Sequence, residues 1–234
     1  STSLPNGTLS SAELNAINAL KSPSPTNPNG QHRITEVIQS ETTIYDSDGI
    51  TELSKNTQRI NYKQENGLVL PKSIESLKNE TTASNALEDR IIYHEYDNKG
   101  NPIEVSKTDG THIVYIWGYN QTQPIAKIEN ASYTEVQSQV ANLQTLSNLD
   151  TDRTLNYDGA EGTLREALDN LRDAPLLSTA MITTYTYDPL IGVTSITDPR
   201  GQTVYYEYDE FNRLKHIKDQ DGNIVSKNDY NYKN

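Results

Sequence analysis

The chain contains no cysteine, which excludes disulfide bonds, thiol catalysis and cysteine-ligated zinc. Phenylalanine and tryptophan occur once each, whereas tyrosine occurs 15 times. This bias indicates that one type of structural position is filled repeatedly. Long apolar runs are also missing: stretches such as Ile113–Trp117 are far too short to cross a bilayer, so we expect no membrane span. No basic and then apolar leader opens the sequence, from which we expect a signal peptide to be lacking or removed.

Basic residues are outnumbered, with 20 Lys and Arg against 32 Asp and Glu, which gives a formal net charge of -12. Nucleic acids and anionic membranes are bound by clustered basic side chains, so we expect neither as a partner. Only 33% of residues are apolar, which is little for a compact α/β enzyme. The tyrosines supply enough amphipathic bulk for a folded chain of one large or two small domains.

The tyrosines belong to a repeat. A Tyr-Asp pair is followed, 13 residues after the aspartate, by glycine, and the tyrosine itself returns after 21 residues. The pairs and their glycines are Tyr96-Asp97 with Gly110, Tyr187-Asp188 with Gly201, and Tyr208-Asp209 with Gly222; Trp117-Gly118 stands 21 residues after Tyr96.

Each repeat predicts two strands and two turns. Tyr-X-Tyr places two rings on one face of a strand, because side chains alternate with period two. The aspartate then opens a turn containing Gly or Asn, since its carboxylate can accept nearby backbone N–H groups. Asp-Gly at 109–110 and 221–222 predicts two-residue hairpin turns. The product is a ribbon of antiparallel hairpins.

Weaker copies lie upstream. Tyr45-Asp46 with Asp48-Gly49 has the same residue types at a different spacing, and the segment 58–70, centred on Asn66-Gly67, predicts another hairpin. We expect strands through residues 33–80.

Helical patterns interrupt the ribbon. Ser132 with Glu135, and Thr163 with Glu166, form capping-box patterns, each near apolar residues at helical spacing. Pro175 ends the second predicted helix. Near the N-terminus, Ser10-Ser-Ala-Glu13 caps a short helix that a Pro-rich stretch, 22–28, follows.

The sequence therefore predicts a mainly β protein, with antiparallel hairpin repeats in a twisted sheet and a small two-helix insertion. The expected divisions are an N-terminal helix and linker (1–30), a repeat sheet (31–130 plus 180–234) and a helical insert within a hairpin (131–179).

The repeat resembles the Rhs, or YD-repeat, family. The resemblance is best over 185–232 and 93–119, and Asn212-Arg213-Leu214 followed by Asp221-Gly222 is especially typical. The resemblance implies a segment of a very large bacterial protein, secreted or on the cell surface, whose repeats wind into a hollow shell around a toxic C-terminal domain. Some such proteins are called wall-associated, and carbohydrate binding has been suggested for them. Three or four clear units are too few to close a shell, so the implied partner is the rest of a larger repeat protein.

One family motif concerns self-cleavage, an Asp-Pro-X-Gly-Leu signature in the terminal plug of the shell. Asp188-Pro-Leu-Ile-Gly192 is similar, but its glycine stands one place late and the segment coincides with an ordinary Tyr-Asp turn. We expect a turn there and no cleavage.

Other candidate chemistry is outweighed by simpler explanations. Solvent-facing strand positions explain the histidines better than a zinc site, although two of them could face each other across the sheet. Turn formation explains the recurring carboxylates better than glycoside hydrolysis. Two segments begin like calcium loops but lack the closing glutamate. The residues considered are His32, His94, His112 and His216; Glu95 with Asp97 and Glu207 with Asp209; and Asp46–Gly49 and Asp219–Gly222.

From the sequence we thus expect no catalytic residues, no metal and no cofactor. The leading hypothesis is a non-catalytic shell or stalk segment at the bacterial surface or outside the cell. The alternative is a carbohydrate- or protein-binding module that uses exposed tyrosines, and an enzyme ranks third.

Overall fold

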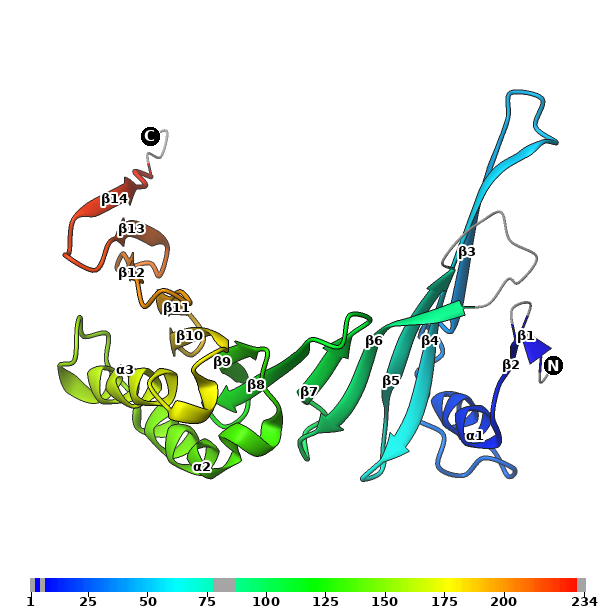
Figure 1. Ribbon diagram of the computed structural model, residues 1–234, viewed down its shortest axis with the longest axis horizontal. Helices are drawn as coiled ribbons and strands as arrows, with labels where there is room; N and C mark the ends of the chain where they lie inside the picture. Colours follow the sequence, from blue (N-terminus) through cyan, green and yellow to red (C-terminus); the bar gives the residue numbers. More distant parts are fainter. Residues whose placement is uncertain (1–2, 5–6, 78–86, 231–234) are drawn as a thin grey trace. The chain divides into compact units, whose positions relative to one another are not determined.

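The computed structural model describes residues 3–4, 7–77 and 87–230. The chain forms two compact units, residues 1–110 and 111–234. Both are built from consecutive antiparallel strands (Figure 1). The prediction of a mainly β fold with antiparallel hairpins and a small helical insertion is confirmed. The predicted division into 1–30, 31–130 plus 180–234, and 131–179 stays a prediction, and the part of the expected strand region beyond residue 77 lies outside the described residues.

The first unit packs one helix against a five-stranded meander. Ser10 caps the helix, because its hydroxyl and backbone N–H share Glu13 as a capping partner, as predicted. Ala16, Ala19 and Leu20 of this helix are buried with Tyr62 and Val69. The elements are β1 (Ser3–Leu4), β2 (Gly7–Thr8), α1 (Ser11–Leu20), β3 (Gln39–Tyr45), β4 (Glu52–Glu65), β5 (Leu68–Leu77), β6 (Leu87–Tyr96) and β7 (Pro102–Lys107).

The second unit is a seven-stranded meander in which each strand pairs with its neighbours in sequence. Two helices connect β9 to β10, which pair directly with each other. The elements are β8 (His112–Gly118), β9 (Gln123–Glu129), α2 (Tyr133–Leu149), α3 (Gly159–Arg172), the short 3-10 helix η1 (Pro175–Leu177), β10 (Met181–Asp188), β11 (Gly192–Thr197), β12 (Thr203–Tyr208), β13 (Leu214–Lys218) and β14 (Ile224–Lys227).

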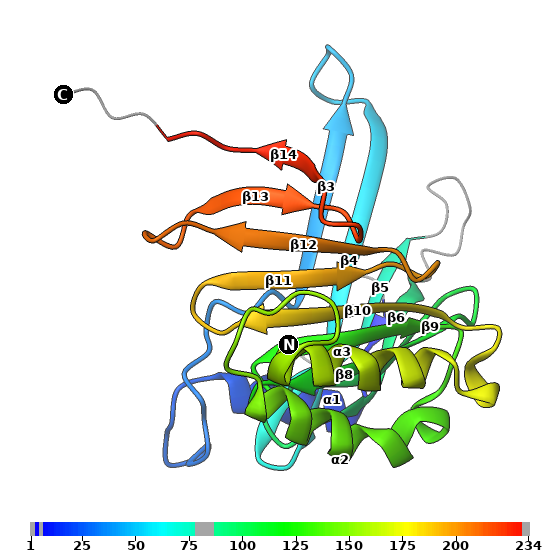
Figure 2. The ribbon, with the colours of Figure 1, turned by 90° about the vertical axis from the view of Figure 1, so that its left-hand side faces the viewer.

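Helices α2 and α3 cover one face of the first strands of this unit (Figure 2). Their apolar positions and the facing strand residues make one buried cluster, because the helical stripe and the period-two strand face are both apolar. Its members include Ile116, Ile125, Ile128, Val136, Leu143, Leu164, Leu168, Leu171 and Ile182.

The second capping box was predicted wrongly. Helix α3 begins at Gly159, four residues before Thr163, whose hydroxyl lies inside the helix and donates to the Gly159 carbonyl. The helix starts early because the Asp152 carboxylate accepts the backbone N–H of Ala160 and so satisfies a donor of its first turn. The Ser132–Glu135 capping box was predicted correctly.

Four of the hairpin turns share one construction. An aspartate pairs its backbone N–H with the carbonyl four residues later, and its Oδ1 accepts the N–H groups two and four residues later; the residue three places on has positive φ. This five-residue turn occurs at Asp97–Asn101, Asp198–Gln202, Asp209–Arg213 and Asp219–Asn223.

The predicted two-residue Asp-Gly turn at 221–222 is therefore wrong. Gly222 has φ of 82°, but Asp221 does not have positive φ, as a type I′ turn would require. Asp219 anchors the turn instead, and Asp109-Gly110 departs from the prediction in the same way. Asn66-Gly67, by contrast, has positive φ at both residues and joins β4 to β5 as a two-residue turn.

A bulge follows most of these turns. On β13, Lys215 is an extra residue between the partners of Glu207 and Tyr208, and on β11 Thr194 is extra between the partners of Thr186 and Tyr187. In these two hairpins the interruption lies on the returning strand, so the tyrosine strand keeps its alternation. Tyr185 and Tyr187 accordingly lie on one face, with ring centroids 6.4 Å apart. In the β6–β7 hairpin, by contrast, His94 is an extra residue on the tyrosine strand.

The tyrosines of three Tyr-Asp pairs, and also Tyr230, which no aspartate follows, reach back to the preceding strand. In each case the tyrosine hydroxyl donates to a backbone carbonyl. The residue that bears this carbonyl is the cross-strand partner of an aromatic residue in the preceding hairpin. The bonds run from Tyr96 to Pro71 (2.7 Å), from Tyr187 to Pro124 (3.1 Å), from Tyr208 to Val193 (2.9 Å) and from Tyr230 to Leu214 (2.9 Å). The paired aromatics are Tyr62, Trp117, Tyr187 and Tyr208. We name these bonds the tyrosine links.

We predict that Asp219→Ala lowers the melting temperature of the chain by a few degrees, because two backbone N–H groups and the Asn223 amide lose their acceptor. Asp221→Ala is the matched control, since it removes a carboxylate from the same turn without removing the anchor. Thermal unfolding followed by circular dichroism measures both. Equal effects of the two variants would contradict this account of the turn.

We also predict energetic coupling between Gly192 and Tyr208. A Cβ at position 192 would lie 2.3 Å from the Tyr208 hydroxyl oxygen, so Gly192→Ala displaces the ring and breaks its link. Tyr208→Phe alone should cost about 1 kcal/mol of unfolding free energy, the typical net value of one hydrogen bond. In the Tyr208→Phe background the cost of Gly192→Ala should fall, which urea denaturation of the four proteins in the cycle measures. Strict additivity would argue against the contact.

Candidate functional site

The side chains of His32, His94 and His216 have partners that are not histidines. His94 and His32 are exposed; their rings lie 2.8 Å from the Ser106 hydroxyl and 2.7 Å from the Ser22 hydroxyl. His216 lies 3.1 Å from Glu207. Among the described residues, the one group of three potential metal ligands contains no histidine.

Of the recurring carboxylates, Glu95 is exposed, whereas the other three are engaged in the strands and turns. Asp97 and Asp209 anchor hairpin turns, and the Arg213 guanidinium, which donates to Asp209, lowers the pKa of that carboxyl. Glu207 accepts from Lys218 at 2.5 Å and from His216. Burial acts to raise the pKa of Glu207, but these hydrogen bonds together lower it. The carboxylates of Asp97, Asp209 and Glu207 thus each bind backbone N–H groups or basic side chains within the sheet.

The three remaining segments of the sequence hypotheses are turns. Asp46–Gly49 joins β3 to β4, and Asp219–Gly222 joins β13 to β14. Asp188–Gly192 joins β10 to β11, where Ile191 donates to the Asp188 carbonyl and Arg153 holds the Asp188 carboxylate at 2.5 Å. That this segment does not cleave the chain stays a prediction.

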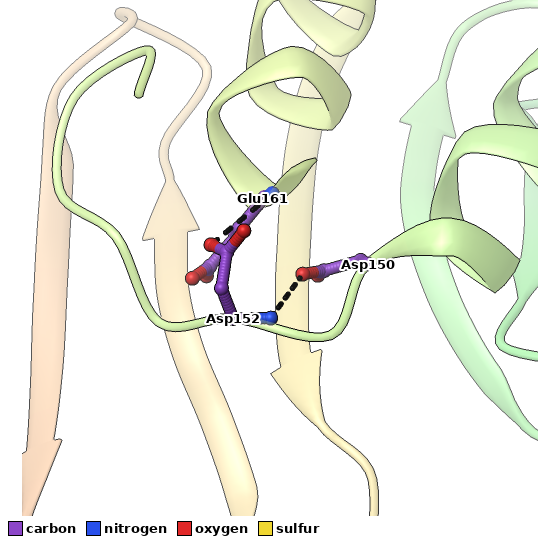
Figure 3. Close-up of side chains that lie close together, drawn as sticks. All are labelled: Asp150, Asp152 and Glu161. Carbon is purple, nitrogen blue, oxygen red and sulfur yellow. Dashed lines mark hydrogen bonds between the residues drawn. The ribbon is translucent and has the colours of Figure 1, made fainter. Parts of the chain in front are cut away.

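A different set of residues, which the sequence analysis did not single out, forms the most concentrated group of charges. Asp150, Asp152 and Glu161 each place a carboxylate oxygen within 4.8 Å of the others (Figure 3). They come from the loop between α2 and α3 and from the first turn of α3. We call these three residues the carboxylate cluster.

Glu161 is the most buried member, with 1% of its surface exposed. Its Oε1 accepts hydrogen bonds from the hydroxyls of Thr186 (2.6 Å) and Thr194 and lies 2.9 Å from Arg165 Nη1. Its Oε2 is buried and has no hydrogen-bond partner among the described residues. Burial raises the pKa of Glu161, against the effect of the hydroxyls and the guanidinium.

Asp150 connects the loop to the sheet. Its Oδ2 accepts from the Tyr119 hydroxyl at 2.6 Å, and that hydroxyl accepts the backbone N–H of Tyr187 at 2.8 Å. Burial raises the pKa of Asp150 to about 6 although the Tyr119 bond opposes it. Asp152 lies between the other two and accepts N–H groups of Thr154 and Ala160; these hydrogen bonds outweigh burial and lower the pKa of Asp152.

Arg165 completes the charged group. Its Nε donates to the Asn156 carbonyl at 2.7 Å and its Nη2 donates to the Thr154 carbonyl, so the guanidinium holds the loop. It also lies over the Tyr205 ring, 5.4 Å from the centroid, and the Tyr205 hydroxyl accepts the Asn156 N–H. The loop between the helices is therefore fastened to β10, β11 and β12.

A polar cavity of about 250 Å³ reaches this group. Its lining contains Glu161 and Thr194 from the buried network, loop residues, and both tyrosine and basic side chains of β12 and β13: Arg153, Thr154, Leu155, Tyr205, Tyr206, Glu207, Tyr208 and Lys215. The arrangement offers oxygen ligands for a cation and an ionic fastening between helices and sheet. The sequence signal that could have found it is a loop rich in aspartate and threonine directly before an acidic first helical turn.

Comparison with known proteins gives a family match for hairpins of the second unit. Residues 192–224, from β11 to the start of β14, match the family model described as RHS Repeat. The chain contains an Rhs repeat. The resemblance to the Rhs, or YD-repeat, family is thereby confirmed. No curated protein matches the chain.

The solved structures that match the chain contain much longer chains. The crystal structure of TcdB2-TccC3 without its hypervariable C-terminal region has a TM-score of 0.39 and 12% identity, over 79% of this chain and 9% of that one. The Photorhabdus luminescens Tc holotoxin pore, with a TccC3 substitution, has a TM-score of 0.38 and 13% identity, over 80% and 8%. The chain thus spans less than a tenth of the length of these structures.

We predict that Glu161→Gln lowers the unfolding free energy by about 3–5 kcal/mol, the typical cost of removing one partner from a buried ion pair. Combining it with Arg165→Met should cost less than the sum of the single changes, because the second change removes the stranded guanidinium. Chemical denaturation of the cycle gives both values. The control is Glu41→Gln, which breaks a half-exposed pair with Lys55 and should cost about 1 kcal/mol or less. A similar loss in both pairs would refute the fastening role.

Proposed function

We propose that the chain is a non-catalytic structural segment of a large bacterial Rhs-type protein, a building block of a shell or stalk. The observation that carries this proposal is the series of tyrosine links. Four tyrosines of the repeat donate their hydroxyls to the preceding strand, so the residue type that dominates the composition serves to join hairpins. The hydroxyls of these four tyrosines are thereby engaged within the sheet.

The last strand supports the same proposal. β14 pairs with β13 on one side, and all four of its residues are exposed, including Ile224 and Val225. An edge strand of this kind presents unpaired backbone groups and apolar side chains to an incoming strand. The partner we propose is the rest of a larger repeat protein, whose next strand would continue the ladder.

The match to the Rhs repeat and the small share of the toxin assemblies that the chain spans are consistent with this role. We extend the proposal to a bacterial protein at the cell surface or outside the cell, and to a kinship with toxin-carrying proteins. Among the described residues, no helix combines the length and apolar character needed to cross a bilayer.

A second candidate function, binding of a carbohydrate or another protein, has one favourable observation. The tip of the β3–β4 hairpin exposes Ile44, Tyr45, Ile50 and Leu53, each more than half exposed. Exposed apolar groups of this size are typical of interaction surfaces. A cell-wall pull-down or glycan array with Tyr45→Ala as the loss-of-binding variant tests this candidate.

We predict that the backbone amides of Ile224–Lys227 exchange faster in this chain alone than in the longer protein that contains it, whereas those of β11 exchange alike in both. The reason is that the outer side of β14 gains a partner strand only in the longer protein. Hydrogen exchange followed by mass spectrometry measures both segments. Equal exchange of β14 in the two proteins would rule out the proposed continuation.

A backbone variant sharpens this test. Asn228 donates its N–H to the Lys215 carbonyl of β13, so the alternate N–H of Lys227 points away from β13. Lys227→Pro should leave the melting temperature of this chain nearly unchanged but make the longer protein more sensitive to protease. Asn228→Pro, which removes the inward bond, should affect both.

A further inference from the structure

The loop between α2 and α3 carries oxygen-bearing side chains at a regular spacing. Asp150 directly follows α2, and Glu161 lies eleven residues later in the first turn of α3. In the helix–loop–helix calcium motif, ligands occupy positions 1, 3, 5, 7, 9 and 12 of a twelve-residue loop between two helices. Positions 1, 3, 5, 9 and 12 of residues 150–161 are Asp150, Asp152, Thr154, Asp158 and Glu161.

The fold brings positions 1, 3 and 12 together. The carboxylate oxygens of the cluster lie within 4.8 Å of one another (Figure 3). Two oxygens on opposite sides of a calcium ion, each bonded at about 2.3–2.6 Å, are about 4.6–5.2 Å apart. The three carboxylates therefore fit around one ion without a change of fold.

An independent observation is that one carboxylate oxygen of Glu161 lacks a hydrogen-bond partner among the described residues. This oxygen, Oε2, is buried, and the residue is 1% exposed. Buried carboxylate oxygens are normally satisfied, since leaving one without a partner costs free energy. Glu161 and Thr154 also line the 250 Å³ cavity, which gives an ion a path from solvent.

The charges balance for a divalent ion. Three carboxylates face one guanidinium, that of Arg165, because the nearby Arg153 is paired with Asp188. With all three carboxylates ionised, two negative charges thus remain in a largely buried group. A doubly charged cation neutralises them.

We propose that Asp150, Asp152 and Glu161 bind one divalent cation, preferably calcium. Leu155 stands where the calcium motif has glycine, and Arg165 occupies the carbonyls of Thr154 and Asn156, so the side chains of the cluster supply the protein ligands and water supplies the others. Calcium accepts such an irregular set of oxygens, whereas magnesium requires a near-ideal octahedron. With few protein ligands, we expect a dissociation constant of about 10⁻⁴ to 10⁻³ M.

The test uses the full chain, freed of metal with a chelator and then titrated with calcium chloride alone. Isothermal titration should show one saturable site, and calcium should raise the melting temperature because the folded chain binds the ion. Terbium should bind at the same place and luminesce on excitation of tyrosine, since the Tyr119 hydroxyl lies 2.6 Å from Asp150.

The decisive variant is Asp150→Asn, whose amide oxygen still accepts the Tyr119 hydroxyl but carries no charge. It should bind calcium at least about tenfold more weakly, because ligand charge sets the affinity of such sites. Asp221→Asn, in a segment that begins like a calcium loop, is the control and should bind like the unchanged chain. The proposal is overturned if the unchanged chain shows no saturable binding up to millimolar calcium, if Asp150→Asn binds equally well, or if magnesium stabilises the chain as much as calcium does.

Discussion

One contact underlies the repeat: a tyrosine hydroxyl that donates to a backbone carbonyl of the preceding strand. A two-stranded hairpin is barely stable by itself, so each hairpin depends on its contacts with the hairpin before it. The tyrosine links fix each new hairpin to the one before it, as from Tyr208 to Val193. At Tyr208 the aspartate that follows, Asp209, anchors the turn, and the bulge on the returning strand leaves the alternation of the tyrosine strand intact. In such a Tyr-Asp pair the tyrosine joins the hairpin to the preceding one, and the aspartate stabilises the turn.

The helical insert depends on a second device, the buried pair of Glu161 and Arg165. Glu161 bonds to hydroxyls of β10 and β11, whereas Arg165 bonds to carbonyls of the interhelical loop, so one ion pair joins three parts of the unit. Buried ion pairs add less stability than specificity, because desolvation offsets much of their attraction. Apolar packing of α2 and α3 buries one face of the sheet, and the ion pair adds polar contacts from the loop and α3 to β10 and β11.

Much of the fold follows from the sequence, because local chemistry determines it. The Tyr-Asp spacing predicts the hairpins, and the serine–glutamate patterns at Ser10 and Ser132 predict two helix starts. The start of α3 could not be predicted, since its capping carboxylate, Asp152, lies outside the capping-box spacing. The carboxylate cluster was missed for a related reason. Sequence patterns reveal recurring acids, such as Asp209, more readily than single ones whose partners come from distant strands.

The acceptors of the tyrosine links have a consequence for how such proteins diversify. They are main-chain oxygens of Pro71, Pro124, Val193 and Leu214, residues with little in common. A joint that uses the main chain on one side constrains the side chain on the other side only. Neighbouring hairpins can therefore change in sequence, duplicate or exchange places without losing the contact between them, provided that the following hairpin carries the tyrosine.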